Sequence, residues 1–354
     1  MQADPIMSVG ATAMSHEIAG AAHPLHLTLF EPNGHRLAQF HQGATLPMFK
    51  TNPFRNPEGQ PLVYGHRGAR GVLPENTMAG FDYLRDIGLP GVEIDVQLTS
   101  DGVPVVIHDP RVPMQLARDA RGNWLPEPGP KIIDLTVEEL LRYDVGRLHP
   151  HHPYSARYPD QRAVDGARVP LLAGFLDWAE QSPDMMLNIE IKSFADQEDL
   201  GASPDALAGA LVDALAGREL AQRCLLSSFD WRVLRVLRDI APDIARGYLT
   251  EEQPGPDCTI FDGSAWMDGL RLADHGNSLP RLIADQCAQC WCAFYRDVTH
   301  KRVAAAHELG LAVNVWTVND TDDIQAMVAM GVDGVITDYP ERALECLARE
   351  DTAR

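Results

Sequence analysis

From residue 61 onward, short apolar runs alternate with stretches in which apolar residues recur at the helical period. Short apolar runs are typical of buried strands, and the longer periodic stretches are typical of amphipathic helices. We expect nine strands, at Leu62–Gly65, Val92–Val96, Val103–Ile107, Met185–Ile191, Cys224–Ser228, Ala245–Leu249, Ala288–Ala293, Leu311–Thr317 and Gly334–Thr337. We expect helices at Glu75–Ile87, Val137–Tyr143, Leu171–Gln181, Pro204–Ala216, Asp230–Ile240, His300–Leu309, Asp320–Met330 and Glu341–Ala348. Because strands and helices alternate, the pattern predicts a parallel sheet.

The second and third runs are joined by a very short link, Thr99–Gly102. A link of this length makes an antiparallel hairpin, since parallel neighbours need a long crossover. We therefore expect Val103–Ile107 to fold back as an accessory strand, which leaves eight strands for a TIM (β/α)8 barrel. Residues 111–170 have no clear βα unit, so the predicted α/β fold carries an insertion there, with one helix near 136–143.

Residues 1–60 show no sustained period and are rich in His, Pro, Gly and polar residues. We interpret them as an N-terminal extension, partly disordered, with one candidate strand at 26–31. A single barrel domain is expected at 61–350, because barrels of this kind routinely use about 250 residues as one domain.

The charge of the chain narrows the choice of partners. A net charge of −20 is a poor match for nucleic acids and anionic membranes, so we expect neither nucleic-acid binding nor stable membrane association. No stretch approaches the apolar length of a membrane span, no signal-peptide pattern is seen, and the six cysteines form no disulfide framework. These observations favour a cytoplasmic protein, or a periplasmic one if the start codon is misassigned; they leave the oligomeric state open.

The densest cluster of reactive side chains lies at the start of the predicted barrel. His66 and Arg67 follow the first strand, and the carboxyl ends of barrel strands form the active face. Glu93 and Asp95 are two positions apart on the second strand, so both point to the same side. Because two inward carboxylates repel each other, the pair predicts a divalent-cation site with oxygen ligands.

The hairpin and two later strands add to this cluster. If the turn lies in the short link, the return strand brings His108 roughly level with Asp95. Glu190 and Lys192 share one face of the strand that follows the insertion, where they can supply a third carboxylate and a phosphate contact. Trp316, at the end of a late strand, can form an apolar wall on the same rim.

Taken singly, each of these residues also has a plain structural explanation. A histidine is often an ordinary polar residue, paired carboxylates often lie on an exposed edge strand, and a Glu–Lys pair can be a simple ion pair. Trp316 can belong to the core. The convergence of two acid/base candidates, three carboxylates and two cations at strand ends is what favours a catalytic site.

In their order along the chain, these residues resemble the glycerophosphodiester phosphodiesterase family. The likeness covers about residues 61–345. It rests on His66-Arg-Gly, Pro74-Glu-Asn-Thr, Glu93-x-Asp-Val, Asp101-Gly-x-Pro-Val-Val-x-His-Asp, Asn188–Lys192, Ser228–Arg232, Val315–Asp320 and Gly331–Pro340. The resemblance implies a TIM barrel and an enzyme that hydrolyses a small glycerophosphodiester to an alcohol and sn-glycerol 3-phosphate.

The resemblance also implies a role for each matching position. It implies catalytic residues His66 and His108, metal ligands Glu93, Asp95 and Glu190, and substrate contacts Arg67, Lys192 and Trp316. The implied cofactor is a divalent cation, Ca²⁺ or Mg²⁺, with Mn²⁺ as a further candidate. Residues 1–60 have no counterpart in the family and 255–297 match only loosely, so the rim that selects the alcohol is left open.

In the implied mechanism, one histidine donates a proton to the leaving alcohol and the other accepts a proton from the nucleophile. We favour His108 as the acid and His66 as the base. The nucleophile is either the glycerol 2-hydroxyl, through a cyclic phosphate, or water.

Two alternatives remain. One is a lysophospholipase D-like or phosphatidylinositol phospholipase C-like lipid phosphodiesterase. An apolar entrance would favour it, whereas the insertion is rich in Arg, His, Asp and Pro. The other is a barrel that binds phosphodiesters without turnover. Loss of a histidine or a carboxylate would favour this binding role, but both histidines and all three carboxylates are present.

Overall fold

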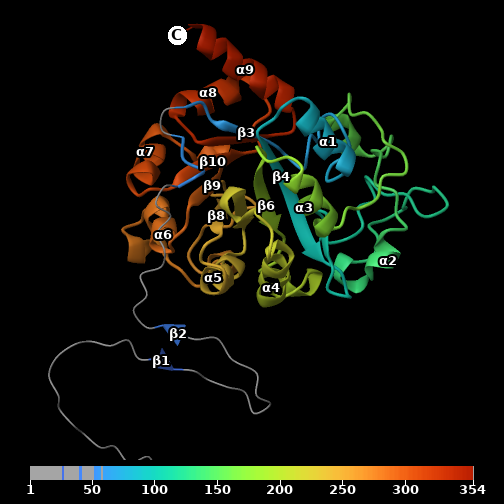
Figure 1. Ribbon diagram of the computed structural model, residues 1–354, viewed down its shortest axis with the longest axis horizontal. Helices are drawn as coiled ribbons and strands as arrows, with labels where there is room; N and C mark the ends of the chain where they lie inside the picture. Colours follow the sequence, from blue (N-terminus) through green and yellow to red (C-terminus); the bar gives the residue numbers. More distant parts are fainter. Residues whose placement is uncertain (1–25, 28–39, 42–51, 57–58, 354) are drawn as a thin grey trace, which may run out of the picture. The chain divides into compact units, whose positions relative to one another are not determined.

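The computed structural model describes residues 26–27, 40–41, 52–56 and 59–353 (Figure 1). The chain divides into two compact units, Met1–Leu46 and Pro47–Arg354. In the first unit, β1 (His26–Leu27) pairs antiparallel with β2 (Phe40–His41). The strand expected at 26–31 is thus present over its first two residues, and its remainder lies outside the described residues.

The second unit is a closed barrel of eight parallel strands, with helices around it (Figure 1). The strands are β3 (Leu62–Gly65), β4 (Gly91–Leu98), β6 (Met186–Ile191), β7 (Cys224–Ser228), β8 (Ala245–Thr250), β9 (Cys290–Phe294), β10 (Ala312–Trp316) and β11 (Gly334–Thr337). The barrel closes where β11 pairs in parallel with β3, with Gly334 opposite Leu62. The predicted TIM-barrel fold is confirmed, and each strand coincides with one of the expected apolar runs.

The accessory strand is also confirmed. β5 (Pro104–Val106) pairs antiparallel with β4, with Val96 opposite Val106, and it takes no other strand partner within the described residues. Gly102 in the connecting turn has φ +75°, a left-handed conformation that glycine adopts at low cost. The hairpin therefore reverses the chain beside β4 and leaves the barrel count at eight.

The helices are α1 (Met78–Asp86), α2 (Val137–Leu140), α3 (Leu172–Glu180), α4 (Pro204–Leu215), α5 (Trp231–Ile240), α6 (Leu279–Asp285), α7 (His300–Glu308), α8 (Thr321–Met330) and α9 (Pro340–Ala353). Two differ notably from expectation. Helix α1 begins three residues late, because Asn76 is left-handed (φ +52°) and Thr77 caps the helix by accepting from the Gly80 amide. Helix α6 was not expected; Ser278 caps it, and it buries Leu279, Leu282 and Ile283.

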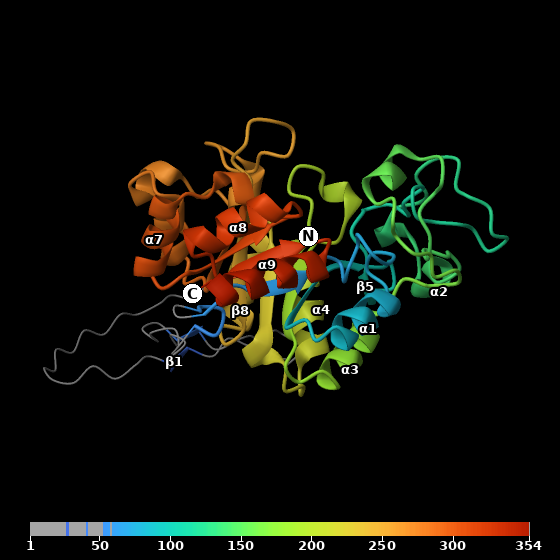
Figure 2. The same ribbon diagram turned by 90° about the horizontal axis from the view of Figure 1, so that it is seen from above.

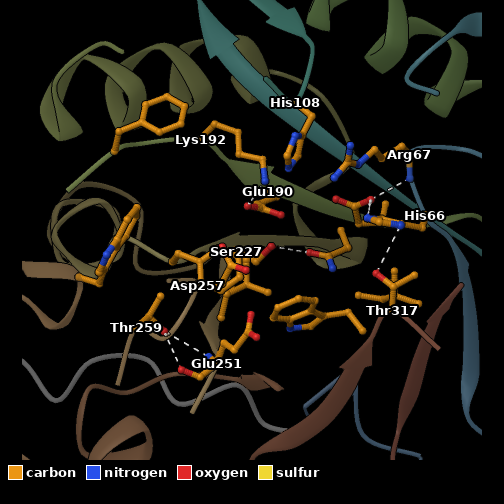
Figure 3. Close-up of a pocket in the computed structure, with 18 of the residues that line it drawn as sticks. His66, Arg67, His108, Glu190, Lys192, Ser227, Glu251, Asp257, Thr259 and Thr317 are labelled. Atoms are coloured by element: carbon orange, nitrogen blue, oxygen red, sulfur yellow. Dashed lines mark hydrogen bonds and ion pairs between the residues drawn. The ribbon is translucent and has the colours of Figure 1, made fainter. Parts of the chain in front are cut away.

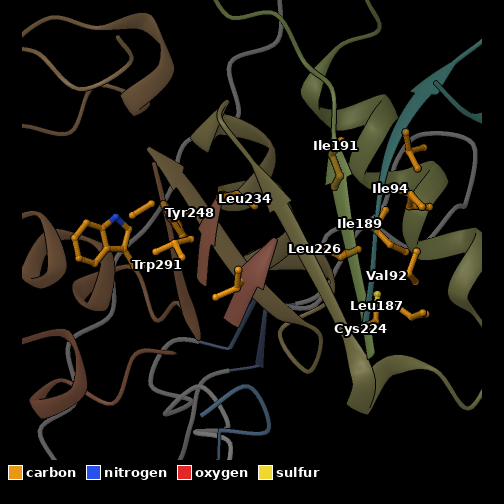
Figure 4. Packing of buried hydrophobic residues seen from close by; sticks show 14 of the residues in the cluster. Val92, Ile94, Leu187, Ile189, Ile191, Cys224, Leu226, Leu234, Tyr248 and Trp291 are labelled. Carbon is orange, nitrogen blue, oxygen red and sulfur yellow. The ribbon is translucent and has the colours of Figure 1, made fainter. Parts of the chain in front are cut away.

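The main core lies between the strands and the helix layer. Alternate strand residues point outward into it, among them Val92 and Ile94 of β4, and Leu234 of α5 packs there from the helix side (Figure 4). Because strand side chains alternate, an outward apolar set forces the intervening residues into the barrel. On β4 and β6 those intervening residues are polar and charged, which is how the fold positions the candidate site.

A short segment before the first strand covers the opposite end of the barrel. Phe54 is buried in a cluster with the first residues of several strands, and Asn52 donates to a carbonyl just before β9. Arg55 lies 3.3 Å from the Asp333 carboxylate. Residues 52–56 therefore contact the barrel, while the domain boundary expected between 60 and 61 stays a prediction.

The insertion at 111–170 lies between β5 and α3 and has a small core of its own. That core comprises Val105, Ile107, Val112, Ala117, Ile132, Leu140, Val145 and Val169. Its one α-helix in the described structure is α2, shorter than the helix expected near 136–143. Figure 2 shows the insertion and the loops that follow β6 and β8 rising on the same side of the barrel. Of the described helices, none has the length and hydrophobicity needed to traverse a bilayer.

Candidate active site

A cavity of about 720 Å³ opens at the carboxyl ends of the barrel strands (Figure 3). Seven of the eight predicted site residues line it: His66, Arg67, Glu93, His108, Glu190, Lys192 and Trp316. The eighth, Asp95, is fully buried beside them. Residues that are up to about 250 positions apart in the sequence thus meet at one end of the barrel, on the face that the strand order predicts.

Strand pairing explains how three carboxylates converge. Asp95 of β4 lies directly opposite Glu190 of β6, and Glu93 lies one inward position earlier on β4. One oxygen from each of the three side chains lies within 4.8 Å of the others. The outward neighbours Ile94 and Ile189 anchor both strands in the main core, so the inward direction of the carboxylates is set by packing.

The pKa values of the two carboxyl groups on β4 are shifted in opposite directions. Burial, followed by the charges of Asp95 and Glu190, raises the pKa of Glu93 well above its usual range. Burial also disfavours ionised Asp95, but Lys192 and Arg67 more than offset it and hold the pKa of that carboxyl well below its usual range. A further cation between these carboxylates would relieve the repulsion that contributes to the raised pKa of Glu93.

Two buried oxygens at this position have no hydrogen-bond donor among the described residues: Asp95 Oδ1 and Asn76 Oδ1. Lys192 Nζ lies 3.0 Å from Asp95 Oδ1 in an ion pair that lacks hydrogen-bond alignment. Oxygen atoms from carboxylates and amides are the ligands that hard divalent cations prefer. The residue set therefore fits such a cation, with Glu93, Asp95 and Glu190 as the residues that would hold it.

His66 follows β3, and its ring is held through Nδ1. Its Nδ1 lies 2.8 Å from Asp338 Oδ1, and its Nε2 lies 3.9 Å from Glu93 Oε2. Burial and the charge of Arg70 lower the pKa of His66 to about 4, although Asp338 acts in the opposite direction. The imidazole is therefore neutral near pH 7, and a neutral imidazole can accept a proton.

His108 follows β5, and the hairpin register places it beside Asp95, as the short link predicts. Its Nδ1 lies 2.7 Å from Asp109 Oδ1, and Gln115 from the insertion donates to Asp109 Oδ2 at 2.8 Å. Burial disfavours ionised Asp109, but the contact with His108 lowers the pKa of that carboxyl to about 2. An ionised carboxylate at Nδ1 orients the ring and stabilises an imidazolium.

Arg67 is fixed by the loop between β3 and α1. Its φ of +51° is left-handed, and its amide donates to Glu93 Oε2 at 2.8 Å. Its guanidinium donates to Glu75 at 2.7 Å, and Glu75 in turn accepts from the Tyr154 hydroxyl of the insertion at 2.5 Å. Because α1 starts late, Glu75 remains in the loop and can hold Arg67 over the cavity.

Several residues of this site were not predicted from the sequence. Asp338 and Asp109, the partners of the two histidines, were not among the predicted site residues, although the position of Asp109 directly after His108 was an available signal. The far wall of the cavity includes Glu251, Asp257 and Trp266, and the last two lie within 255–297, which resembles the family only loosely.

Comparisons with known proteins identify the family to which the chain belongs. Residues 66–342 match the family model described as the Glycerophosphoryl diester phosphodiesterase family. The chain is 29% identical over 288 residues to a glycerophosphodiester phosphodiesterase of Caldanaerobacter subterraneus subsp. tengcongensis, an alignment that spans 81% of this chain and 98% of the relative.

Two solved structures are also similar. One, from Silicibacter pomeroyi and assigned as a glycerophosphoryl diester phosphodiesterase, has a TM-score of 0.75 and 36% identity over 84% of this chain and 97% of that one. The other is an Oleispira antarctica phosphodiesterase in complex with the product sn-glycerol-3-phosphate. Its TM-score is 0.59 at 24% identity, over 82% of this chain and 97% of that one, a likeness that speaks to the fold alone. The chain therefore belongs to the glycerophosphoryl diester phosphodiesterase family, a family of hydrolases that act on glycerophosphodiesters.

Proposed function

We propose that this chain releases sn-glycerol 3-phosphate and an alcohol from glycerophosphodiesters, with His66 and His108 as the acid/base pair and a divalent cation as cofactor. The observation that supports this most is the arrangement of charge around the cavity. Three inward carboxylates lie within 4.8 Å of one another, and the cavity that they adjoin is lined by two histidines. Each histidine has a carboxylate of its own at Nδ1.

His66 suits the role of general base. Its Nδ1 is occupied by Asp338, and its lowered pKa keeps the ring neutral near pH 7. In this proposal its Nε2 accepts the proton of the nucleophile, either the glycerol 2-hydroxyl or a water molecule. The Oleispira antarctica relative was solved with sn-glycerol-3-phosphate as product, which is the product proposed here.

His108 suits the role of general acid. The Asp109 carboxylate at Nδ1 orients the ring, so that its other nitrogen can face the oxygen of the departing alcohol and donate a proton to it. His66 and His108 line the same cavity, so one bound phosphodiester can contact both rings.

Arg67 and Lys192 are proposed to orient the phosphodiester. Both are cations that line the cavity, and each is held in place by carboxylates: Arg67 by Glu75, and Lys192 by Asp95 and Glu190. When bound by Glu93, Asp95 and Glu190, a divalent cation supplies Lewis-acid stabilisation of the charge that develops on the phosphate. Ca²⁺, Mg²⁺ and Mn²⁺ are all candidates for this hard oxygen-ligand site.

The test is a substrate panel with release of sn-glycerol 3-phosphate as the readout. Purified protein is stripped of metal and assayed on several glycerophosphodiesters with Ca²⁺, Mg²⁺ or Mn²⁺ added back. We expect turnover of at least one diester in the presence of a divalent ion. Lysophosphatidylcholine serves as the comparison substrate, since preferential hydrolysis of that lipid would support the lipid phosphodiesterase alternative.

A further inference from the structure

The cavity that holds the two histidines continues to a second wall of different chemistry. Loops after β6 and β8 supply the carboxylates of Asp196, Glu251 and Asp257, together with the aromatic rings of Phe194 and Trp266. Figure 3 shows Glu251 and Asp257 on the side of the cavity away from His66 and Arg67. The volume of about 720 Å³ is in the range that encloses ligands larger than glycerol phosphate, so a substrate can reach both walls.

The three carboxylates of this wall have no partner in the described part of the chain. No hydrogen bond or ion pair engages the side-chain oxygens of Asp196, Glu251 or Asp257 there. Arg302, which contacts the same loop, is already paired, because it donates to Glu252 at 2.6 Å and to the carbonyl of Asp297.

Burial and neighbouring negative charges both act on the carboxyl group of Glu251. Its side chain is half-buried, and burial together with the charges of Asp257 and Asp297 raises its pKa to about 7. A carboxyl with a raised pKa at the edge of a cavity is one that a cationic ligand would stabilise in its ionised form.

The opposite wall presents cations, three of which are paired with carboxylates: Arg67 with Glu75, Arg70 with Asp338, and Lys192 with Asp95 and Glu190. Arg67, Arg70, Arg157 and Lys192 all line the cavity on the histidine side. An anionic phosphodiester held there has its departing alcohol directed away from these cations, toward the acidic wall. A cavity with cations that can contact a phosphate at one wall and carboxylates without partners at the other is complementary to a zwitterion.

The aromatic residues add a second preference. Trp266 and Phe194 are half-buried and line the cavity alongside the carboxylates. The face of an aromatic ring attracts a cation within about 6 Å, and such rings are used to bind quaternary ammonium groups. The aromatic contribution therefore selects for the same charge as the carboxylates, by a separate physical effect.

We propose that Glu251, Asp257 and Trp266 form a subsite for a cationic alcohol, one that carries a primary or quaternary ammonium group. The placement of the phosphate at the cationic wall rests on the proposed function. The loop that carries Asp257 and Trp266 lies within 255–297, which resembles the family only loosely.

Binding tests the subsite independently of turnover. Calorimetry on the metal-loaded protein compares choline with dimethylbutanol, in which carbon replaces the ammonium nitrogen and only the charge is lost. We expect choline to bind at least about tenfold more tightly. In the double variant E251Q/D257N this advantage should disappear. The control variant D262N should still bind choline more tightly than dimethylbutanol. Asp262 is an exposed carboxylate in the same loop, but its side chain does not line the cavity.

Kinetics then link the subsite to catalysis. The kcat/KM for glycerophosphocholine and glycerophosphoethanolamine is compared with that for glycerophosphoinositol, whose alcohol is neutral. E251Q/D257N should lower the first two values about tenfold or more and leave the third unchanged. Trp266→Leu should lower the value for glycerophosphocholine most, and Trp266→Phe should restore much of it.

The possible outcomes separate the two proposals. Equal binding of choline and dimethylbutanol by the wild-type protein would overturn the subsite, even if glycerophosphoinositol is hydrolysed as the proposed function expects. Selective binding of choline that depends on Glu251 and Asp257, without turnover of any glycerophosphodiester, would overturn the proposed function and leave the subsite standing.

Discussion

His66 Nδ1 and Asp338 Oδ1 lie 2.8 Å apart, although 272 positions separate the two residues in the sequence. The contact joins the end of the first barrel strand to the end of the last, where β11 closes the barrel against β3. Asp338 also binds Arg70 through Nε at 2.8 Å and Nη2 at 3.1 Å. Closure of the barrel is therefore what orients the proposed base.

Removal of the Asp338 charge should impair catalysis through His66. We expect Asp338→Asn to lower kcat at least about tenfold, because the carboxylate fixes the ring and favours its protonation as it accepts a proton. Loss of that charge lowers the pKa of His66, so the acidic limb of the kcat/KM profile should move to lower pH. Asp320→Asn, an exposed acid that makes no side-chain cap to helix α8, is the control. If the acidic limb of the kcat/KM profile stays at the same pH in Asp338→Asn, Asp338 has a purely structural role.

The two histidines should each be required for turnover. We expect His66→Ala and His108→Ala to lower kcat by at least about 10²-fold, because each removes one proton-transfer group. Circular dichroism should show an unchanged fold, and His300→Ala, at an exposed position on α7, should keep wild-type activity. Near-wild-type turnover in either active-site variant would refute that histidine's role.

Chelation should abolish activity, and a divalent ion should restore it. We expect Glu190→Gln to weaken binding of Mn²⁺, followed by electron paramagnetic resonance, by at least about tenfold, since it removes one of three carboxylates. Glu198→Gln, which alters an exposed carboxylate in the next loop, should bind Mn²⁺ as the wild-type protein does. Full activity of metal-free protein would exclude the three-carboxylate site.

Acid should destabilise the protein partly through Asp338. Burial alone would raise the pKa of this carboxyl, but Arg70 and His66 hold it well below its usual range. The folded state thus binds a proton less readily than the unfolded state, so this stabilisation is present above about pH 4 and is lost as the pH falls further. Urea unfolding between pH 3 and pH 7 should show a shallower loss of unfolding free energy for Asp338→Asn. Parallel curves for the two proteins would contradict this.

The segment before β3 should contribute measurably to stability. Phe54 is buried against residues at the start of several strands, so Phe54→Ala should lower the free energy of unfolding by about 3 kcal/mol. Phe261→Ala, at a side chain that is 51% exposed, should change it by less than about 0.5 kcal/mol. Denaturant midpoints of the two variants provide the comparison, and equal effects would show that the segment does not support the barrel.

Much of the barrel was predictable from local pattern. Apolar runs locate buried strands wherever they lie, and the short Thr99–Gly102 link could only form a hairpin. Two features of the helices were harder to predict. The start of α1 depends on the left-handed backbone of Asn76, and α6 is a short helix in a segment with little periodicity.

The sequence by itself determined that charged residues face into the barrel on β4 and β6, since the period of a strand places Glu93, Asp95, Glu190 and Lys192 opposite the apolar positions. It also determined that they lie at one end, because parallel strands share a direction. Only the tertiary structure decided which groups touch them. Asp338 reaches His66, and Glu251 and Asp257 form the facing wall, through barrel closure and loop packing, and such contacts between distant residues leave no local signal in the chain.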